Sequence, residues 1–216
     1  MKALVIEKEA IRNNIAVVRA RAGSAAIYAV LSGDGQGLGL IELATLCREA
    51  GIGRFAVHQA EEAVALRLEH PEAQIIAGGT DVLVQMREGR RAGKELISIQ
   101  KIDSMRGVSM DEDENIRIGS LTTFSHITRN PIIIEKINVL GEAVDMVGGP
   151  QIRNAGTIGG NTCNGVTSAD SASTLHAWEA IVELTGVNGK RYLPIKDFYI
   201  KAGTVDINVA EGEIQT

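Results

Sequence analysis

The segment Gly149-Pro150-Gln151-Ile152-Arg153-Asn154-Ala155-Gly156-Thr157-Ile158-Gly159-Gly160-Asn161 is the most informative part of this chain for its fold and its ligand. Its glycines are dense and its polar residues small, which allows many backbone donors to converge on one object. Downstream, Ser168 and Asp170 follow, and a carboxylate there can accept hydrogen bonds from sugar hydroxyls, as acidic residues do in nucleotide sites. The alternative is a packed irregular segment in which Asn161 and Asp170 satisfy the backbone.

A second segment of the same kind lies upstream, at Ile75-Ile76-Ala77-Gly78-Gly79-Thr80-Asp81-Val82-Leu83. An apolar strand enters two glycines, and a helix is predicted to start at Thr80 or Asp81. Free N–H groups at such a position favour anions, which suits a diphosphate. The alternative is a tight turn with Asp81 as a helix cap. Two such segments in one chain favour a ligand of nucleotide size.

Composition narrows the class of protein. The net charge of −5 argues against nucleic acid as a partner, because phosphate binding draws on clustered Lys and Arg. No apolar run is long enough to span a membrane, and the charges within Met1–Lys8 come too early for a secretory signal, so a cytoplasmic location is expected. Two cysteines cannot form the four-thiolate site of an iron–sulfur cluster, and the histidines are scattered, so any redox role requires an organic cofactor.

The first half alternates apolar strands with helical stripes. Strands are predicted at residues 27–31, 55–57 and 74–76, with helices around residues 11–18, 43–50 and 59–69 and a short one ending near Met86. This βαβαβ order predicts parallel strands with helical crossovers.

The second half predicts an α+β arrangement. Residues 107–110 and 115–118 flank the acidic turn Asp111–Glu114, and residues 181–185 and 191–193 meet at Asn188-Gly189, a strong hairpin signal. Helices are predicted at residues 133–147 and 171–179. Leu175 and Trp178 share a helical face, which predicts that Trp178 lies in the core.

Several further motifs accompany the two glycine-bearing segments, in order along the chain: Glu62-Ala63, His70-Pro71-Glu72-Ala73, Ile118-Gly119-Ser120, Thr122-Thr123-Phe124 and Ser168-Ala169-Asp170. Through them, the chain from about Ala56 to the C-terminus resembles the FAD-binding subunit of xanthine dehydrogenase-type molybdenum hydroxylases. The resemblance implies an α+β fold in which N-terminal βαβαβ units precede a PCMH-type FAD-binding fold of two subdomains, with mixed and antiparallel sheet.

The resemblance also implies the cofactor and its site. FAD would have its diphosphate wrapped by the first segment and its adenosine side held by the second, with a serine and an aspartate completing the pocket. The implied cofactor-binding residues are Ile75, Ile76, Ala77, Gly78, Gly79, Thr80, Asp81, Val82, Thr157, Ile158, Gly159, Gly160, Asn161, Ser168 and Asp170. No catalytic acid, base or metal ligand is predicted, because the flavin performs the redox chemistry.

The same resemblance implies partners. In this family electrons reach the flavin from 2Fe–2S clusters on a neighbouring subunit, the molybdenum cofactor lies on another subunit, and reduced flavin passes hydride to NAD⁺. The small number of cysteines agrees with clusters held elsewhere. Neither a nucleic acid nor a membrane is an expected partner.

The beginning of the chain resembles a different family. Ala10–Ile15, Ile27–Leu31, Gly33–Gly39 and Arg54–Val57 are similar to the N-terminal part of alanine racemase, a pyridoxal-phosphate barrel enzyme. Ser32 stands where that family has its cofactor lysine and Gln36 where it has a tyrosine, so this segment is expected to be inactive. The two resemblances overlap near Phe55–Arg67, where a junction, natural or engineered, is our hypothesis.

The two resemblances suggest a division of the chain. Residues 1–57 would be a racemase-like βα segment, residues 58–200 the FAD-binding domain, and residues 201–216 the start of a truncated C-terminal flavoprotein domain. Two rival functions stay open: a non-catalytic fusion or truncated protein without cofactor, and a pyridoxal-phosphate racemase-like protein, which Ser32 argues against.

Overall fold

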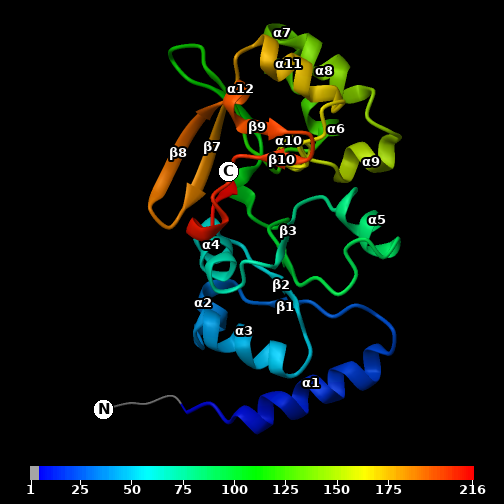
Figure 1. Ribbon diagram of the computed structural model, residues 1–216, viewed down its shortest axis with the longest axis vertical. Coiled ribbons are helices and arrows are strands. Elements are labelled where there is room, and N and C mark those ends of the chain that lie inside the picture. Colours follow the sequence, from blue (N-terminus) through cyan, green and yellow to red (C-terminus); the bar gives the residue numbers. More distant parts are fainter. Residues whose placement is uncertain (1–4) are drawn as a thin grey trace.

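The computed structural model describes residues 5–216 and places the first half of the chain on a parallel sheet (Figure 1). Part of the Met1–Lys8 stretch lies outside the described residues. The sheet has the order β1-β2-β4-β3, and all its pairs are parallel. Its strands are β1 (Ala29–Val30), β2 (Arg54–Ala56), β3 (Gln74–Ile76) and β4 (Leu96–Ser98). The predicted parallel arrangement is confirmed, although the sequence pattern did not predict β4.

Helices connect these strands. They are α1 (Lys8–Ala22), α2 (Ser32–Gly37), α3 (Leu40–Glu49), α4 (Ala60–Glu69) and α5 (Val82–Arg87). α4 begins with a capping box between Gln59 and Glu62, which satisfies N–H groups that would otherwise lack partners. Figure 1 shows α1 at one end of the molecule, where none of its residues is buried.

α2 has an unusual backbone. Residues 33–36 all have positive φ, from 53° at Asp34 to 67° at Gly33, so this turn is left-handed. Such a conformation is costly outside glycine and needs support from its surroundings. The support comes from the buried Glu62 carboxylate, which accepts hydrogen bonds from the N–H groups of Gly33 (2.7 Å), Asp34 (3.3 Å), His58 (3.2 Å) and Gln59 (3.3 Å).

The second half contains antiparallel strands. Both predicted hairpins are confirmed, and a third strand pairs with β7 at the end of the chain. The strands are β5 (Val108–Met110), β6 (Ile116–Ile118), β7 (Ile181–Gly186), β8 (Gly189–Pro194), β9 (Tyr199–Lys201), β10 (Thr204–Val205) and β11 (Ile214–Gln215). β9 and β10 form a separate antiparallel pair.

The helices of this half are short. The α-helices are α6 (Phe124–Ile127), α7 (Pro131–Lys136), α8 (Asn138–Asp145), α9 (Pro150–Ala155), α10 (Ile158–Cys163), α11 (Asp170–Ala177) and α12 (Ile195–Phe198). Two 3₁₀ turns, η1 (Asp103–Met105) and η2 (Val209–Glu211), complete the structure.

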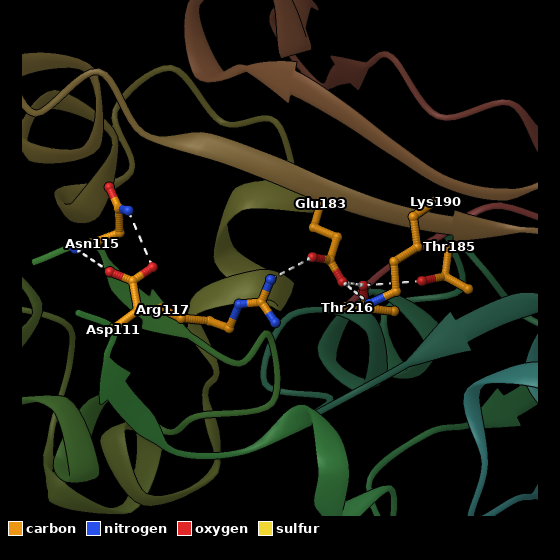
Figure 2. Close-up of polar contacts among 7 residues, drawn as sticks. All are labelled: Asp111, Asn115, Arg117, Glu183, Thr185, Lys190 and Thr216. Atoms are coloured by element: carbon orange, nitrogen blue, oxygen red, sulfur yellow. Dashed lines mark hydrogen bonds and ion pairs between the residues drawn. The ribbon is translucent and has the colours of Figure 1, made fainter. Parts of the chain in front are cut away.

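Polar side chains connect the β5–β6 hairpin with the second sheet (Figure 2). The Glu183 carboxylate on β7 accepts from Arg117 (3.1 Å) and Lys190 (2.6 Å), and from the Thr216 hydroxyl (3.2 Å). In the turn of the hairpin, Asp111 accepts from the backbone and side chain of Asn115. Glu183 therefore joins three segments that are distant in sequence.

Two expectations about this half were wrong. The single helix predicted at residues 133–147 is two helices, interrupted at Ile137 (φ −141°, ψ 50°), because the β-branched residues around it have low helix propensity and burial holds the Ile137 side chain in the core. Trp178 is 56% exposed rather than buried. α11 ends at Ala177, so Trp178 is the C-cap residue beyond the last helical position, where the helical periodicity no longer determines which side faces the core.

The main core spans the predicted segment boundary. One cluster of buried side chains includes Leu31, Phe55, Ile97 and Leu121, and also Ile214 near the end of the chain. Figure 1 shows the C-terminal segment (red) returning to the middle of the molecule, where η2 and β11 contact α4. Among the described helices, none is both long and apolar enough to cross a membrane.

Candidate FAD site

The two glycine-bearing segments, which are about eighty residues apart in sequence, line one cavity of about 430 Å³. This volume lies in the roughly 300–1,000 Å³ range of small-molecule sites. Their backbones touch: a Cβ added to Gly78 would lie 1.8 Å from the Ala155 carbonyl oxygen. Only glycine allows this approach, so the sequence feature that predicted a ligand loop also allows the loops to meet.

Most of the predicted site residues line this cavity. They are Ile75, Ala77, Gly78, Gly79, Thr80, Asp81, Val82, Thr157, Gly159, Gly160 and Asn161. Four predicted residues do not. Ile76 and Ile158 are buried in the core at 5% exposure each, because alternate residues of a strand or helix turn face away from the ligand side. Ser168 and Asp170 are exposed and lie outside the cavity lining.

The first segment, residues 75–82, offers unused backbone donors. Gly79 has φ +73°, which bends the chain between β3 and α5. The N–H groups of residues 78–81 donate no hydrogen bond to any residue in the range 5–216. Asp81 makes no capping bond with its side chain, which accepts instead from the Gln85 amide, so the helix-cap alternative for Asp81 is not what the structure shows.

The second segment, residues 149–161, forms part of the cavity wall but leaves few backbone N–H groups free for a ligand. Gly159 N–H donates to the Ser120 carbonyl (2.9 Å), and Gly160 N–H donates to the Thr157 hydroxyl (3.1 Å). Asn161 N–H donates to the Thr157 carbonyl. The expectation that backbone donors of this segment converge on the ligand was therefore wrong, because Gly159 donates to the Ser120 segment and Gly160 and Asn161 donate to Thr157 at the start of α10.

Asn161 is the polar side chain that this segment presents to the cavity. Its Oδ1 accepts a hydrogen bond from the Ser171 hydroxyl (2.6 Å), which fixes the amide plane. Its Nδ2 makes no hydrogen bond within the described chain and lies in a residue that lines the cavity. Asn161 is therefore oriented as a donor.

Residues from the end of the chain close the cavity, and the sequence did not reveal them. Glu213, Ile214 and Gln215 line it. Arg191 donates to both carboxylate oxygens of Glu213 (2.9 and 2.8 Å), a bidentate pair. Burial, the largest single effect, would raise the pKa of Glu213, but the hydrogen bonds from Arg191 and the Asn208 N–H, together with the Arg191 charge, lower that pKa overall. No local pattern signals this pair, because its members are far apart in sequence.

Cys163, at the end of α10, also lines the cavity. Its Sγ donates to the Gln215 side-chain oxygen (2.9 Å), and burial raises the pKa of its thiol to about 12. Cys163 is therefore a neutral, unreactive thiol at neutral pH.

These features fit an elongated dinucleotide. Free N–H groups after β3 suit a diphosphate, and Gly160, which lines the cavity without a side chain, lets a ligand approach the backbone of the second segment. No described group of three or more His, Cys, Asp or Glu side chains is placed to hold a metal ion.

Comparison with known proteins also indicates FAD as the cofactor. Residues 51–214 match the family described as "FAD binding domain in molybdopterin dehydrogenase". The chain is 38% identical over 146 residues to the putative xanthine dehydrogenase FAD-binding subunit of Escherichia coli K12, covering 68% of this chain and 50% of that protein. It is 34% identical over 161 residues to the nicotinate dehydrogenase FAD-subunit of Eubacterium barkeri, covering 74% and 54%.

Superposition on solved structures supports the α+β fold. A carbon monoxide dehydrogenase chain from Hydrogenophaga pseudoflava superposes with a TM-score of 0.71 at 32% identity, covering 75% of this chain and 56% of that one. The chain spans about half the length of the curated relatives it matches. The α+β fold and FAD as the cofactor are confirmed, and the chain belongs to the family of FAD-binding domains of molybdopterin dehydrogenases.

Proposed function

We propose that this chain is the FAD-binding, electron-transfer part of a xanthine dehydrogenase-like molybdenum hydroxylase. The observation that carries the proposal is the single cavity lined by both glycine-bearing segments. Bound FAD supplies a two-electron carrier that can be reduced by single-electron iron–sulfur clusters and oxidised by hydride transfer to NAD⁺.

The residues of the chain bind and orient the cofactor. The free N–H groups of residues 78–81 would hold the diphosphate, and the Asn161 amide would donate to the adenosine side. Ser168 and Asp170 are proposed to complete the nucleotide contacts. Ser171, beside them at the start of α11, bonds to Asn161, so these residues follow closely on the side chain that faces the cavity.

We further propose a 2Fe–2S subunit and a molybdenum cofactor subunit as partners, with NAD⁺ as the acceptor. Relatives include medium chains of carbon monoxide dehydrogenases, and one solved relative is named as an enzyme that lacks the Mo-pyranopterin part of its molybdenum cofactor. Cys47 and Cys163 are both free thiols, which suits a reducing cytoplasm, and they are too few to bind a cluster in this chain.

The division into residues 1–57, 58–200 and 201–216 is retained as a proposal about origin. The match to the FAD-binding family begins at residue 51. The racemase-like segment contributes β1 and β2 to the shared sheet, and we propose that it serves as a scaffold for β4 and β3 rather than as a second active site.

An FAD titration of the purified chain tests the proposal. We expect the apoprotein to quench FAD fluorescence with a saturable, 1:1 isotherm and to retain a yellow flavin spectrum after gel filtration. A protein that stays colourless after FAD addition would support the non-catalytic alternative. A pyridoxal-phosphate absorption band, abolished by borohydride treatment, would support the racemase-like alternative.

The partner and acceptor assignments need a separate test. With the 2Fe–2S and molybdenum subunits co-expressed, we expect the three chains to co-purify and to reduce NAD⁺ when a purine substrate is added. Co-purification with electron transfer to a dye but not to NAD⁺ would reject NAD⁺ as the acceptor while leaving the FAD site intact.

A further inference from the structure

Arg67 is a cation of the cavity that lacks an anionic partner. It lies on α4, two residues before the end of the helix, and its side chain lines the cavity together with both glycine-bearing segments. Its Nε is buried and has no hydrogen-bond partner. Its Nη1 donates one long bond, 3.3 Å, to the Ala73 carbonyl.

The structure offers Arg67 no carboxylate. Within residues 5–216, no Asp or Glu oxygen lies within ion-pair distance of its guanidinium, whereas Arg191 has two. The buried carboxylate of the cavity, Glu213, is already bound by Arg191. Two further groups near Arg67 can carry negative charge: Glu72, which is exposed and paired with Lys94, and Cys163, which burial keeps a thiol by raising its pKa to about 12.

A buried and largely unpaired guanidinium is unfavourable. Desolvation lowers the pKa of Arg67 from its ordinary value, yet arginine stays charged in proteins. Such a charge is stabilised when an anion with several acceptor oxygens enters the site. Arg91, the other arginine that lines the cavity, already donates to the side chains of Gln85 and Gln74.

We propose that Arg67 binds the diphosphate of FAD, as an anion-binding side chain additional to the backbone donors of residues 78–81. This inference rests on the proposed function, because it takes FAD as the ligand of the cavity. The diphosphate is chosen because it is the group of FAD that is charged at neutral pH, while the adenine, ribityl chain and oxidised flavin ring are neutral. A phosphate also matches the fork of donors that a guanidinium presents.

The Arg67→Met variant tests the proposal, because methionine keeps an unbranched apolar stem and removes the charge. We expect FAD and ADP to bind about 10- to 100-fold more weakly, the range for losing a charge-assisted contact. Riboflavin, which has no phosphate, should bind with an affinity within about twofold of the parent. The Kd for FAD should also depend less on salt in the variant. Arg129→Met removes an exposed arginine outside the cavity lining and is the matched control.

A packing role predicts different results. If Arg67 served the fold alone, the apo variant would melt at a lower temperature; we expect an unchanged or higher Tm, because an unpaired buried charge is removed. Arg67→Lys should recover part of the ADP affinity.

The outcomes separate this inference from the proposed function. Failure of the parent protein to bind FAD would reject the proposed function and this inference together. Parent-like FAD and ADP affinity in Arg67→Met would overturn only the role of Arg67. A loss confined to riboflavin and FAD, with ADP unaffected, would overturn the diphosphate assignment by placing the guanidinium at the flavin ring.

Discussion

At the scale of single residues, Gly160 is where the space for a ligand depends on a missing side chain. A Cβ there would lie 3.0 Å from the Thr157 hydroxyl oxygen and 3.9 Å from the Ala77 Cβ, so a branched side chain would extend between the two segments. We expect Gly160→Val to abolish FAD retention through gel filtration while the far-UV circular dichroism spectrum stays unchanged.

Gly149→Val is the control for that variant. Gly149 has an extended backbone (φ −94°), lies outside the cavity lining, and has one atom, the Gln151 side-chain oxygen at 3.3 Å, within 4 Å of an added Cβ. It should retain FAD. Parent-like FAD affinity in Gly160→Val would refute the assignment of the second segment to the cofactor.

We predict that His70 makes the free energy of unfolding depend on pH. It is buried against Phe55, and its Nε2 has no hydrogen-bond partner. Burial lowers the pKa of His70, with the nearby Arg48 charge adding to the effect. Between the lowered folded pKa and the unfolded value near 6.5, the unfolded state binds more protons, so stability falls as the pH drops below about 6.5.

The measurement is urea unfolding at pH 7.5 and pH 5.5. We expect the free energy of unfolding of the parent to decrease over this interval, and the decrease to be smaller in His70→Leu. Equal decreases in both proteins would show that His70 does not titrate in the folded state as described.

At the scale of elements, Glu62 connects two turns at the carboxyl end of the parallel sheet. It accepts from two N–H groups of the left-handed α2 turn and from two at the start of α4. We expect Glu62→Ala to lower the free energy of unfolding by about 2–4 kcal/mol, because buried donors lose a charged acceptor.

Glu61→Ala is the matched control, since Glu61 is the exposed neighbour on the same helix. It should change the free energy of unfolding by less than about 0.5 kcal/mol. Equal effects of the two substitutions in urea unfolding would mean that the Glu62 hydrogen bonds do not support the left-handed turn.

Some secondary-structure elements could be predicted from the sequence and others could not. Both hairpins and the parallel orientation of the strands in the first half follow from local patterns, such as Asn188-Gly189 between two apolar stretches. The break at Ile137 and the exposure of Trp178 do not, because each depends on which side of a helix end faces the core. Helix ends are where tertiary packing most easily overrides periodicity.

At the scale of the whole molecule, one sheet joins residues before and after the start of the FAD-binding family match at residue 51. β1 and β2 pair in parallel, and β2 pairs with β4 at Phe55–Ile97, so residues on both sides of position 57 share a core. Shared cores unfold cooperatively in small domains. We therefore expect the backbone amide hydrogens of β1, β2 and β4 to exchange with solvent through the same cooperative unfolding event.

Hydrogen exchange measured at several urea concentrations tests this. The amides of Leu31 and Val57, which donate to Ala56 and Ser98, should have the same free energy of opening and the same urea dependence as those of β4. A lower free energy of opening for residues before 57 would show that this part of the chain unfolds independently of β4.

The sequence alone determined the α+β class, the FAD family and the two segments that form the site. These features are encoded locally. The glycines at 78–79 and 159–160 have no side chain, so other backbone segments can approach them closely. Ile76 and Ile158 belong to these segments but face the core, because position within a segment does not say on which side of a strand or turn a residue lies, whereas Ser168 and Asp170, which the resemblance implied, stay a proposal.

The tertiary structure alone decided that Arg67, Glu213 and Gln215 face the cavity and that Glu62 supports α2. Each of these side chains acts on residues distant in sequence, through contacts that exist only after the parallel sheet has formed and β11 has paired with β7. Local patterns encode backbone conformation, whereas the pairing of charges in the interior depends on which distant segments the fold brings together.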